Sequence, residues 1–141
     1  MSPPVPVNPA SLAPPRGYSH GMKGAGEVLF VSGQVGWDGQ GRMVAGGFVA
    51  QFAQALGNVL AVVRAAGGAP EDLAKMTIYV TDLDAYRSST RAIGAAWRAR
   101  LGKHFPAMAL VGVAGLVERR ALVEIEAVAA LGDDAASGEP R

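Results

Sequence analysis

The chain has 141 residues, half of them hydrophobic and 18% charged, which suits a single globular domain with its own core. The formal net charge is +1, and no basic cluster is interleaved with aromatic residues, so nucleic-acid binding is not expected. Cysteine is absent, which excludes disulfides, a thiol nucleophile and metal sites with cysteine ligands. No apolar run reaches the roughly 18 residues of a membrane span, and the N-terminus does not resemble a secretory signal. We therefore expect a cytoplasmic protein without membrane contacts.

The two ends of the chain differ in composition from its middle. Residues 1–16 are rich in proline, which removes backbone donors and fixes φ, and this predicts an extended arm. Residues 132–141 carry Asp, Ser, Gly and Pro without periodicity, which predicts a loose tail. The folded domain is therefore expected over residues 17–131.

The first half of the expected domain holds a strand, a turn and a helix. The apolar run at residues 28–31 predicts a short strand that ends at Ser32 and Gly33. Residues 37–41 contain the Asp-Gly pair of a tight turn. Apolar residues then recur at helical spacing over residues 48–66, which predicts an amphipathic helix.

The second half predicts a strand, a helix and two further strands. Residues 75–80 alternate with period two, as a half-buried strand does, and Thr81 or Asp82 can cap a following helix that ends at Gly102. Strands are expected at residues 107–113 and 122–128. The apolar stripe of this second helix consists of Tyr86, Ile93, Trp97 and Leu101.

These elements predict an α+β domain with a single sheet and two helices packed on one face. The strand at residues 107–113 is apolar or small on both faces, with Met108 and Leu110 on one face and Ala109 and Val111 on the other. Two helices can cover only one face of a sheet, and a large exposed apolar patch is unusual for a monomer. We therefore expect a symmetric homo-oligomer, with Met108 on the face that a neighbouring subunit closes.

Four sequence strings resemble motifs of the Rid (YjgF) family, the enamine/imine deaminases also labelled endoribonuclease L-PSP. The run His-Phe-Pro-Ala-Met-Ala-Leu-Val-Gly-Val at residues 104–113 is similar to the Pro-Ala-Arg-Ser strand of that family. Gly-Tyr-Ser at 17–19, Leu-Phe-Val-Ser-Gly-Gln at 29–34 and Val-Glu-Ile-Glu-Ala at 123–127 extend the match. The resemblance implies a chorismate-mutase-like fold, a homotrimer and a small-molecule ligand in the cleft between subunits.

The resemblance also suggests site residues. Glu124 matches the glutamate that positions the attacking water, although a carboxylate pair on a strand is more often a solvated edge, and Glu126 is expected to be structural. Tyr18 matches a pocket-lining tyrosine, which in isolation would more often be a packing residue. Gly33, with Ser32, matches a main-chain substrate contact. Thr90 aligns with a family asparagine, although its place on the helix stripe favours packing.

Met108 stands where the family carries the arginine that grips the substrate carboxylate. A bidentate guanidinium suits a carboxylate better than other side chains, whereas methionine offers no donor and makes a pocket more apolar. Leu110, where the best-known deaminases have cysteine, changes the pocket in the same direction. We expect weak or no activity on 2-iminopropionate, unless Arg16 or Arg91 supplies the cation from another direction.

Other kinds of site find no support in the residue pattern. His20 and His104 are the only histidines, and neither has a second ligand at metal spacing, so neither a metal nor another cofactor is expected. Three functions remain open. The first is hydrolysis of an imine, enamine or related compound other than the usual imino acids. The second is a non-catalytic trimer that binds small ligands, and the third and least favoured is endoribonuclease activity or translation inhibition.

Overall fold

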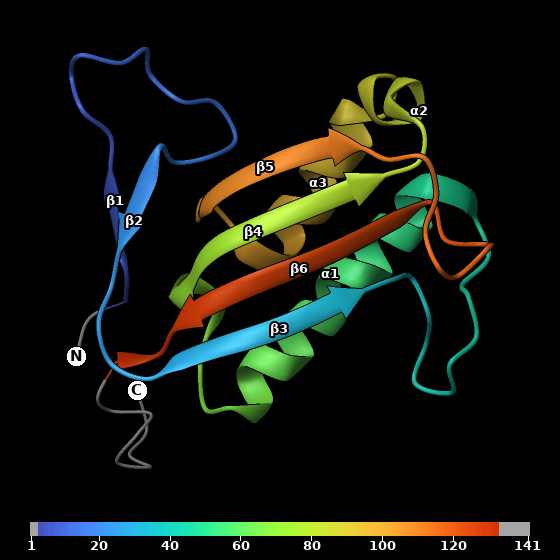
Figure 1. Cartoon of the computed structure of the whole chain (residues 1–141), viewed down its shortest axis with the longest axis horizontal. Helices are drawn as coiled ribbons and strands as arrows, with labels where there is room; N and C mark the ends of the chain where they lie inside the picture. The colour runs from blue at the N-terminus through green and yellow to red at the C-terminus, as the bar shows by residue number, and fades with distance from the viewer. Residues whose placement is uncertain (1–2, 133–141) are drawn as a thin grey trace.

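The computed structural model describes residues 3–132 (Figure 1), and the expected tail at 132–141 lies outside them except for Gly132. The elements follow one another from a short N-terminal hairpin through a central helix to two final strands. In chain order they are β1 (Val5–Val7), β2 (Gly21–Lys23), β3 (Val28–Gln34), α1 (Gly47–Ala65), the 3-10 turn η1 (Pro70–Asp72), β4 (Leu73–Val80), α2 (Leu83–Arg87), α3 (Thr90–Leu101), β5 (Ala107–Gly112) and β6 (Val123–Ala130).

Four of the strands form a mixed sheet in the order β3-β6-β4-β5. Strand β6 runs antiparallel to both β3 and β4, whereas β4 and β5 are parallel and are joined through α2 and α3. Helices α1 and α3 lie together on one side of this sheet (Figure 1). The prediction of an α+β domain with one main sheet and helices on one face is therefore confirmed.

The core lies between the sheet and α1. In β6, and in β4 from Met76 onward, every second side chain is buried, so the period-two pattern of these strands gives one core face and one other face. Within the described residues α1 is the one helix long and apolar enough to cross a membrane, but its apolar stripe packs on the sheet as a core helix does. Its buried members include Phe52, Leu56, Val59, Leu60 and Val63.

The second helix is interrupted, unlike the continuous helix that we expected. Asp82 caps α2 as predicted, because its carboxylate accepts hydrogen bonds from the backbone N–H groups of Asp84 and Ala85. The Ser88 hydroxyl then donates to the Asp84 and Ala85 carbonyls, and the chain restarts as α3 at Thr90. Serine side chains compete in this way with the backbone of a helix, which accounts for the break.

The N-terminal arm is held against the domain. Strands β1 and β2 form a separate antiparallel pair that the sequence analysis did not predict, with Val5 opposite Lys23. Between them the His20 backbone N–H donates to the Asn8 side-chain oxygen over 2.8 Å. The ring Nε2 of His20 lies 2.7 Å from the Ala13 carbonyl. The proline-rich segment is thus extended, and its hydrogen bonds with His20 close it into a loop.

The side of the sheet away from the helices carries no element of the described chain over its centre, and Figure 1 looks onto it. We refer to it as the uncovered face. Apolar residues on it are exposed, with Phe30 at 77% and Val28 at 53%. Polar side chains also lie on it. Those of the two central strands, β4 and β6, include Thr77, Tyr79, Glu124 and Glu126.

Candidate functional site

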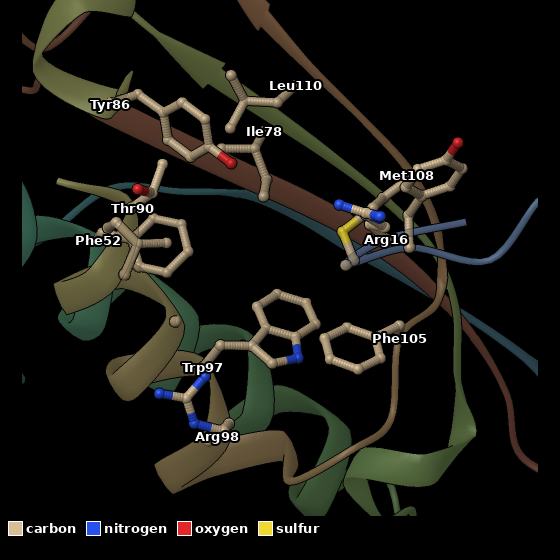
Figure 2. A pocket seen from close by; sticks show the side chains of 14 residues that line it. Arg16, Phe52, Ile78, Tyr86, Thr90, Trp97, Arg98, Phe105, Met108 and Leu110 are labelled. Carbon is tan, nitrogen blue, oxygen red and sulfur yellow. The ribbon is translucent and has the colours of Figure 1, made fainter. Parts of the chain in front are cut away.

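A pocket of about 270 Å³ opens at the β5 edge of the sheet, between the strands and α3. Its wall draws on the arm, on the loop before β5 and on five secondary-structure elements, namely α1, β4, α2, α3 and β5 (Figure 2). We call it the aromatic pocket. Its lining residues are Arg16, Gly17, Tyr18, Phe52, Ile78, Tyr86, Thr90, Ile93, Gly94, Trp97, Arg98, Phe105, Met108 and Leu110.

Two stacked aromatic rings form a fixed part of the wall. The rings of Trp97 and Phe105 are nearly parallel, at 3°, with centroids 6.0 Å apart. The Trp97 indole N–H donates to the His104 carbonyl over 3.0 Å, and the His104 ring nitrogen lies 2.8 Å from the Leu73 carbonyl. These contacts tie α3, the loop before β5 and the start of β4 together, so the aromatic wall is preorganised.

Met108 and Leu110 lie on the helix side of the sheet. The β4–β5 register pairs Met108 with Met76 and Leu110 with Ile78, and both β4 partners are buried in the core. Partners in a register share a face, so Met108 and Leu110 point toward α3 and line the pocket. The expectation that they lie on the face away from the helices was wrong, because alternation alone cannot say which face the helices occupy.

Tyr18 reaches the pocket because the next residue is anchored beside β5. Ser19 is buried, its backbone N–H donates to the Pro106 carbonyl over 3.0 Å, and its hydroxyl donates to the Phe105 carbonyl over 2.5 Å. Ser19 also forms a parallel bridge with Ala107. The Tyr18 ring is 38% exposed and meets the His20 ring edge to face, with centroids 5.4 Å apart.

Polar groups stand around the apolar wall. The side chains of Thr90 and Tyr86 line the aromatic pocket, and Thr90 is exposed instead of packing in the core. The packing interpretation of Thr90 was therefore wrong, and the reason is the helix break, which puts Thr90 at the first position of α3. Of the two arginines considered from the sequence, Arg16 lines the pocket, whereas Arg91 does not. Arg98 lines it as well, at the other end in the view of Figure 2.

The remaining predicted residues lie together on the uncovered face. Glu124 of β6 is half-buried and pairs in register with Tyr79. Its carboxylate rests against the backbone of Gly33, where an added Cβ would lie 2.7 Å from the Glu124 Cδ. Ser32 is exposed beside it, at the irregular end of the β3–β6 pairing, and its carbonyl accepts from the Gln34 amide over 3.2 Å. Glycine at position 33 is thus what allows the carboxylate this close to the main chain.

Glu126 lies two residues after Glu124 on the same face of β6 and is hydrogen-bonded to Tyr79. The Tyr79 hydroxyl donates a short hydrogen bond to the Glu126 carboxylate. This hydrogen bond, with smaller contributions from desolvation and from the negative charges of Glu126 and Glu124, raises the pKa of the Tyr79 phenol above its ordinary value of 10.0. The bond supports the interpretation of Glu126 as a structural residue.

The seven predicted residues therefore form two groups on opposite sides of the sheet. Tyr18, Thr90, Met108 and Leu110 line the aromatic pocket, whereas Glu124 is with Gly33 and Ser32 on the uncovered face. The family resemblance implies that Glu124 and Tyr18 belong to one pocket. Within one chain they do not meet, because the sheet lies between them.

Part of the pocket is not evident from the sequence pattern. Helical spacing places Trp97 and Tyr86 on the apolar stripe of the helix and suggests no role for Phe105 or Arg98. Two features of the sequence could have indicated these lining residues. They are the helical spacing of Trp97 and Arg98 from Thr90, and the Phe-Pro pair that follows this helix. In residues 3–132 no group of three or more His, Asp and Glu side chains could hold a metal ion.

Comparisons with known proteins agree over almost the whole described chain. The family model described as endoribonuclease L-PSP matches residues 8–131. A 2-iminobutanoate/2-iminopropanoate deaminase of Salmonella typhimurium is 36% identical over 124 residues, which cover 86% of this chain and 90% of that protein. A RutC family protein of Pyrococcus horikoshii is 34% identical, covering 79% of this chain and 85% of that protein. The crystal structure of the Rid family protein YyfB of Yersinia pestis, of unknown function, superposes with a TM-score of 0.81 at 33% identity, covering 92% of this chain and all of that one.

Proposed function

The chain belongs to the Rid (endoribonuclease L-PSP) family, and on that basis we propose that it is a cytoplasmic hydrolase of an imine, enamine or related compound other than the usual small imino acids. The observation that carries the proposal is the aromatic pocket, with Met108 and Leu110 in its wall. A relative is named a 2-iminobutanoate/2-iminopropanoate deaminase, and the same class of reaction, on a different substrate, suits this pocket.

The proposed reaction needs only water as a second reactant. The water oxygen bonds to the imine carbon, the C=N π bond opens, and one water proton moves to nitrogen, which gives a carbinolamine. The C–N bond then breaks as the hydroxyl proton moves to nitrogen, which leaves a carbonyl compound and ammonia. Glu124 orients the water, accepts its proton and passes it to the nitrogen, and Tyr18 contributes a hydroxyl at the substrate. Ser32 and Gly33 offer main-chain groups, and Thr90 adds a second hydroxyl.

The proposed site requires two subunits. Support comes from the separation of Glu124 from the aromatic pocket by the sheet, and from the apolar residues exposed on the uncovered face. In a homotrimer, Glu124 and Gly33 of one subunit would meet Tyr18 and Met108 of a neighbour, with the ligand in the cleft between them. An uncovered apolar face of this kind is unusual in a monomer, which favours the assembly.

The replacement of arginine by Met108 predicts a low rate on 2-iminopropionate. A hydrogen bond to a charged group is worth about 1.5–3 kcal/mol, so a small imino acid that loses the donor at position 108 and makes no compensating apolar contact with Trp97 and Phe105 should react roughly ten- to a hundredfold more slowly. Imino acids can be generated by an amino-acid oxidase, and keto-acid formation can be followed for alanine and for larger apolar amino acids. Turnover of 2-iminopropionate as fast as that of the Salmonella relative would contradict the proposal.

Glu124→Gln tests the catalytic part of the proposal. We expect it to lower turnover at least about a hundredfold, the usual size of a general acid–base contribution, with unchanged folding. Gly33→Ala should act through the same carboxylate, because its methyl group would collide with the Glu124 side chain and turn it away. Its unfolding free energy should change by less than about 1 kcal/mol. Gly39→Ala, where the added methyl group meets no atom within 4 Å, is the matched control.

A second candidate function is ligand binding without catalysis. The preorganised aromatic wall favours it as much as it favours an enzyme. If no imine is hydrolysed but small apolar ligands raise the melting temperature, the chain is a binding protein. Endoribonuclease activity is less well supported, because the net charge is +1 and the two histidines hydrogen-bond to separate backbone carbonyls.

A further inference from the structure

Among the described residues that line the aromatic pocket, the charged side chains are all cationic. They are Arg16 and Arg98. Figure 2 shows Arg16 at the end with Met108 and Arg98 at the opposite end. Within residues 3–132, no carboxylate forms an ion pair with Arg16. The ion pair in this part of the chain joins Arg87 and Asp84. A guanidinium beside an apolar cavity and without a protein anion is suited to a carboxylate ligand.

The arm holds Arg16 at this place. Ser19 is bonded to the Phe105 and Pro106 carbonyls, so the chain three residues after Arg16 is fixed beside the first residues of β5. Gly17 lies between, with φ of +73°, a left-handed conformation that other residues rarely adopt. The turn at Gly17 directs Arg16 and Tyr18 to the same pocket. Any other residue at position 17 would disfavour this left-handed turn.

We propose that Arg16 binds the substrate carboxylate in place of an arginine at position 108, and that the substrate carries a bulky apolar group, aromatic or branched. The carboxylate would lie at the Arg16 end, and the apolar group would pack on Trp97 and Phe105. This inference rests on the proposed function in taking the aromatic pocket as the substrate site. It also explains the thioether at 108, because an arginine there would bring a second positive charge to the Arg16 end.

The proposal also names a substrate class for the reaction. A small imino acid would satisfy Arg16 but leave the stacked rings uncovered, whereas a neutral apolar imine would fill the pocket and leave Arg16 without a partner. An imino acid with an aromatic or branched side chain satisfies both ends. The enzyme class that supplies such a compound is an oxidase acting on the corresponding amino acid, which removes two electrons from its C–N bond, or a dehydratase acting on the β-hydroxy derivative of that amino acid.

Binding of stable acids tests the inference without any turnover. The probes are 3-phenylpropanoate, its neutral amide 3-phenylpropanamide, and propanoate, measured by calorimetry. We expect the wild-type protein to bind 3-phenylpropanoate at least about tenfold more tightly than either other probe. Arg16→Gln should weaken binding of the acid roughly ten- to a hundredfold and leave the amide unchanged. Arg91→Gln, the same change on an exposed arginine outside the pocket, is the matched control.

Two outcomes would overturn the inference. One is an acid preference that survives in Arg16→Gln while the variant keeps the wild-type circular dichroism and melting temperature. The other is equal binding of propanoate and 3-phenylpropanoate, which would refute the bulky apolar group. The double variant Arg16→Gln, Met108→Arg moves the cation from the arm to β5 at the same end of the pocket. It should restore the preference for the acid over the amide. If the protein binds acids through Arg16 but hydrolyses no imine, this inference stands and the proposed hydrolase activity is refuted. If it hydrolyses an imine but shows no preference for acids, the hydrolase activity stands and this inference is refuted.

Discussion

At the centre of the uncovered face, Tyr79 donates a hydrogen bond to Glu126 beside the proposed catalytic Glu124. This bond keeps the Glu126 side chain directed at β4, so two carboxylates only two residues apart on one strand have different surroundings. Glu124 instead rests against Gly33. At the scale of single residues, the two glutamates therefore differ in their contacts because they have different neighbours on the adjacent strands.

The raised pKa of the Tyr79 phenol predicts a late tyrosine titration. Because the folded state favours the protonated phenol, its contribution to stability is fully present below about pH 10 and is lost as the pH rises through the higher folded-state pKa. Absorbance of phenolate should show one of the three tyrosines ionising above the ordinary range. Tyr79→Phe should remove that step, and Glu126→Gln should move it to lower pH. A titration that is the same in all three proteins would contradict this interpretation.

At the scale of elements, the N-terminal arm forms part of the wall of the aromatic pocket. Its β1–β2 pairing and the hydrogen bonds of His20 close it, and Ser19 fixes its end at β5. The arm thereby carries Arg16 and Tyr18 to a pocket whose other walls come from residues 52–110. A segment rich in proline can do this because it loses little conformational entropy when it is held.

Removal of the Ser19 hydroxyl tests the anchoring of the arm. Ser19→Ala loses the hydrogen bond to the Phe105 carbonyl at a buried position, which should lower the unfolding free energy by about 0.5–1.5 kcal/mol. It should also weaken binding of 3-phenylpropanoate, because Arg16 is less well held. Urea denaturation at one protein concentration measures the first effect and calorimetry the second. Ser11→Ala, on the exposed part of the arm, should change neither quantity.

At the scale of the whole molecule, the uncovered face supports the proposed assembly. Phe30 and Val28 project from β3 with 77% and 53% of their surface exposed, and Val111 of β5 is 41% exposed at the opposite edge of the same sheet. Burial of apolar surface stabilises by about 25 cal/mol per Å², so contact between these faces would be favourable. The proposed two-subunit site requires in addition that the β5 edge, where the aromatic pocket opens, lies against the uncovered face of a neighbouring chain.

A charge on the uncovered face should therefore prevent the proposed trimer. Phe30→Lys is expected to convert a species of three chain masses into a monomer, as measured by light scattering after size-exclusion chromatography. It should also abolish imine turnover although it leaves every proposed site residue in place. Val117→Lys is the control, because Val117 is fully exposed on the loop before β6. A monomeric wild-type protein that is active would contradict the two-subunit site.

The local pattern of this sequence determined its elements and its family. Period-two and helical spacing located β4, β5, β6 and α1 within one or two residues, since these patterns follow directly from which side chains must leave water. The motif strings identified the family. They also singled out Met108, because a family motif shows where an expected side chain is missing.

Only the tertiary structure decided which residues meet. Alternation along β5 and β6 separates two faces but does not say which one the helices cover, and for this reason the sequence could not place Met108 and Glu124 on opposite sides of the sheet. The break before Thr90 depends on side-chain bonds of Ser88, and the position of Arg16 depends on bonds between Ser19 and residues far along the chain. Contacts between distant residues are set by packing and register, which a pattern of neighbours along the chain does not contain.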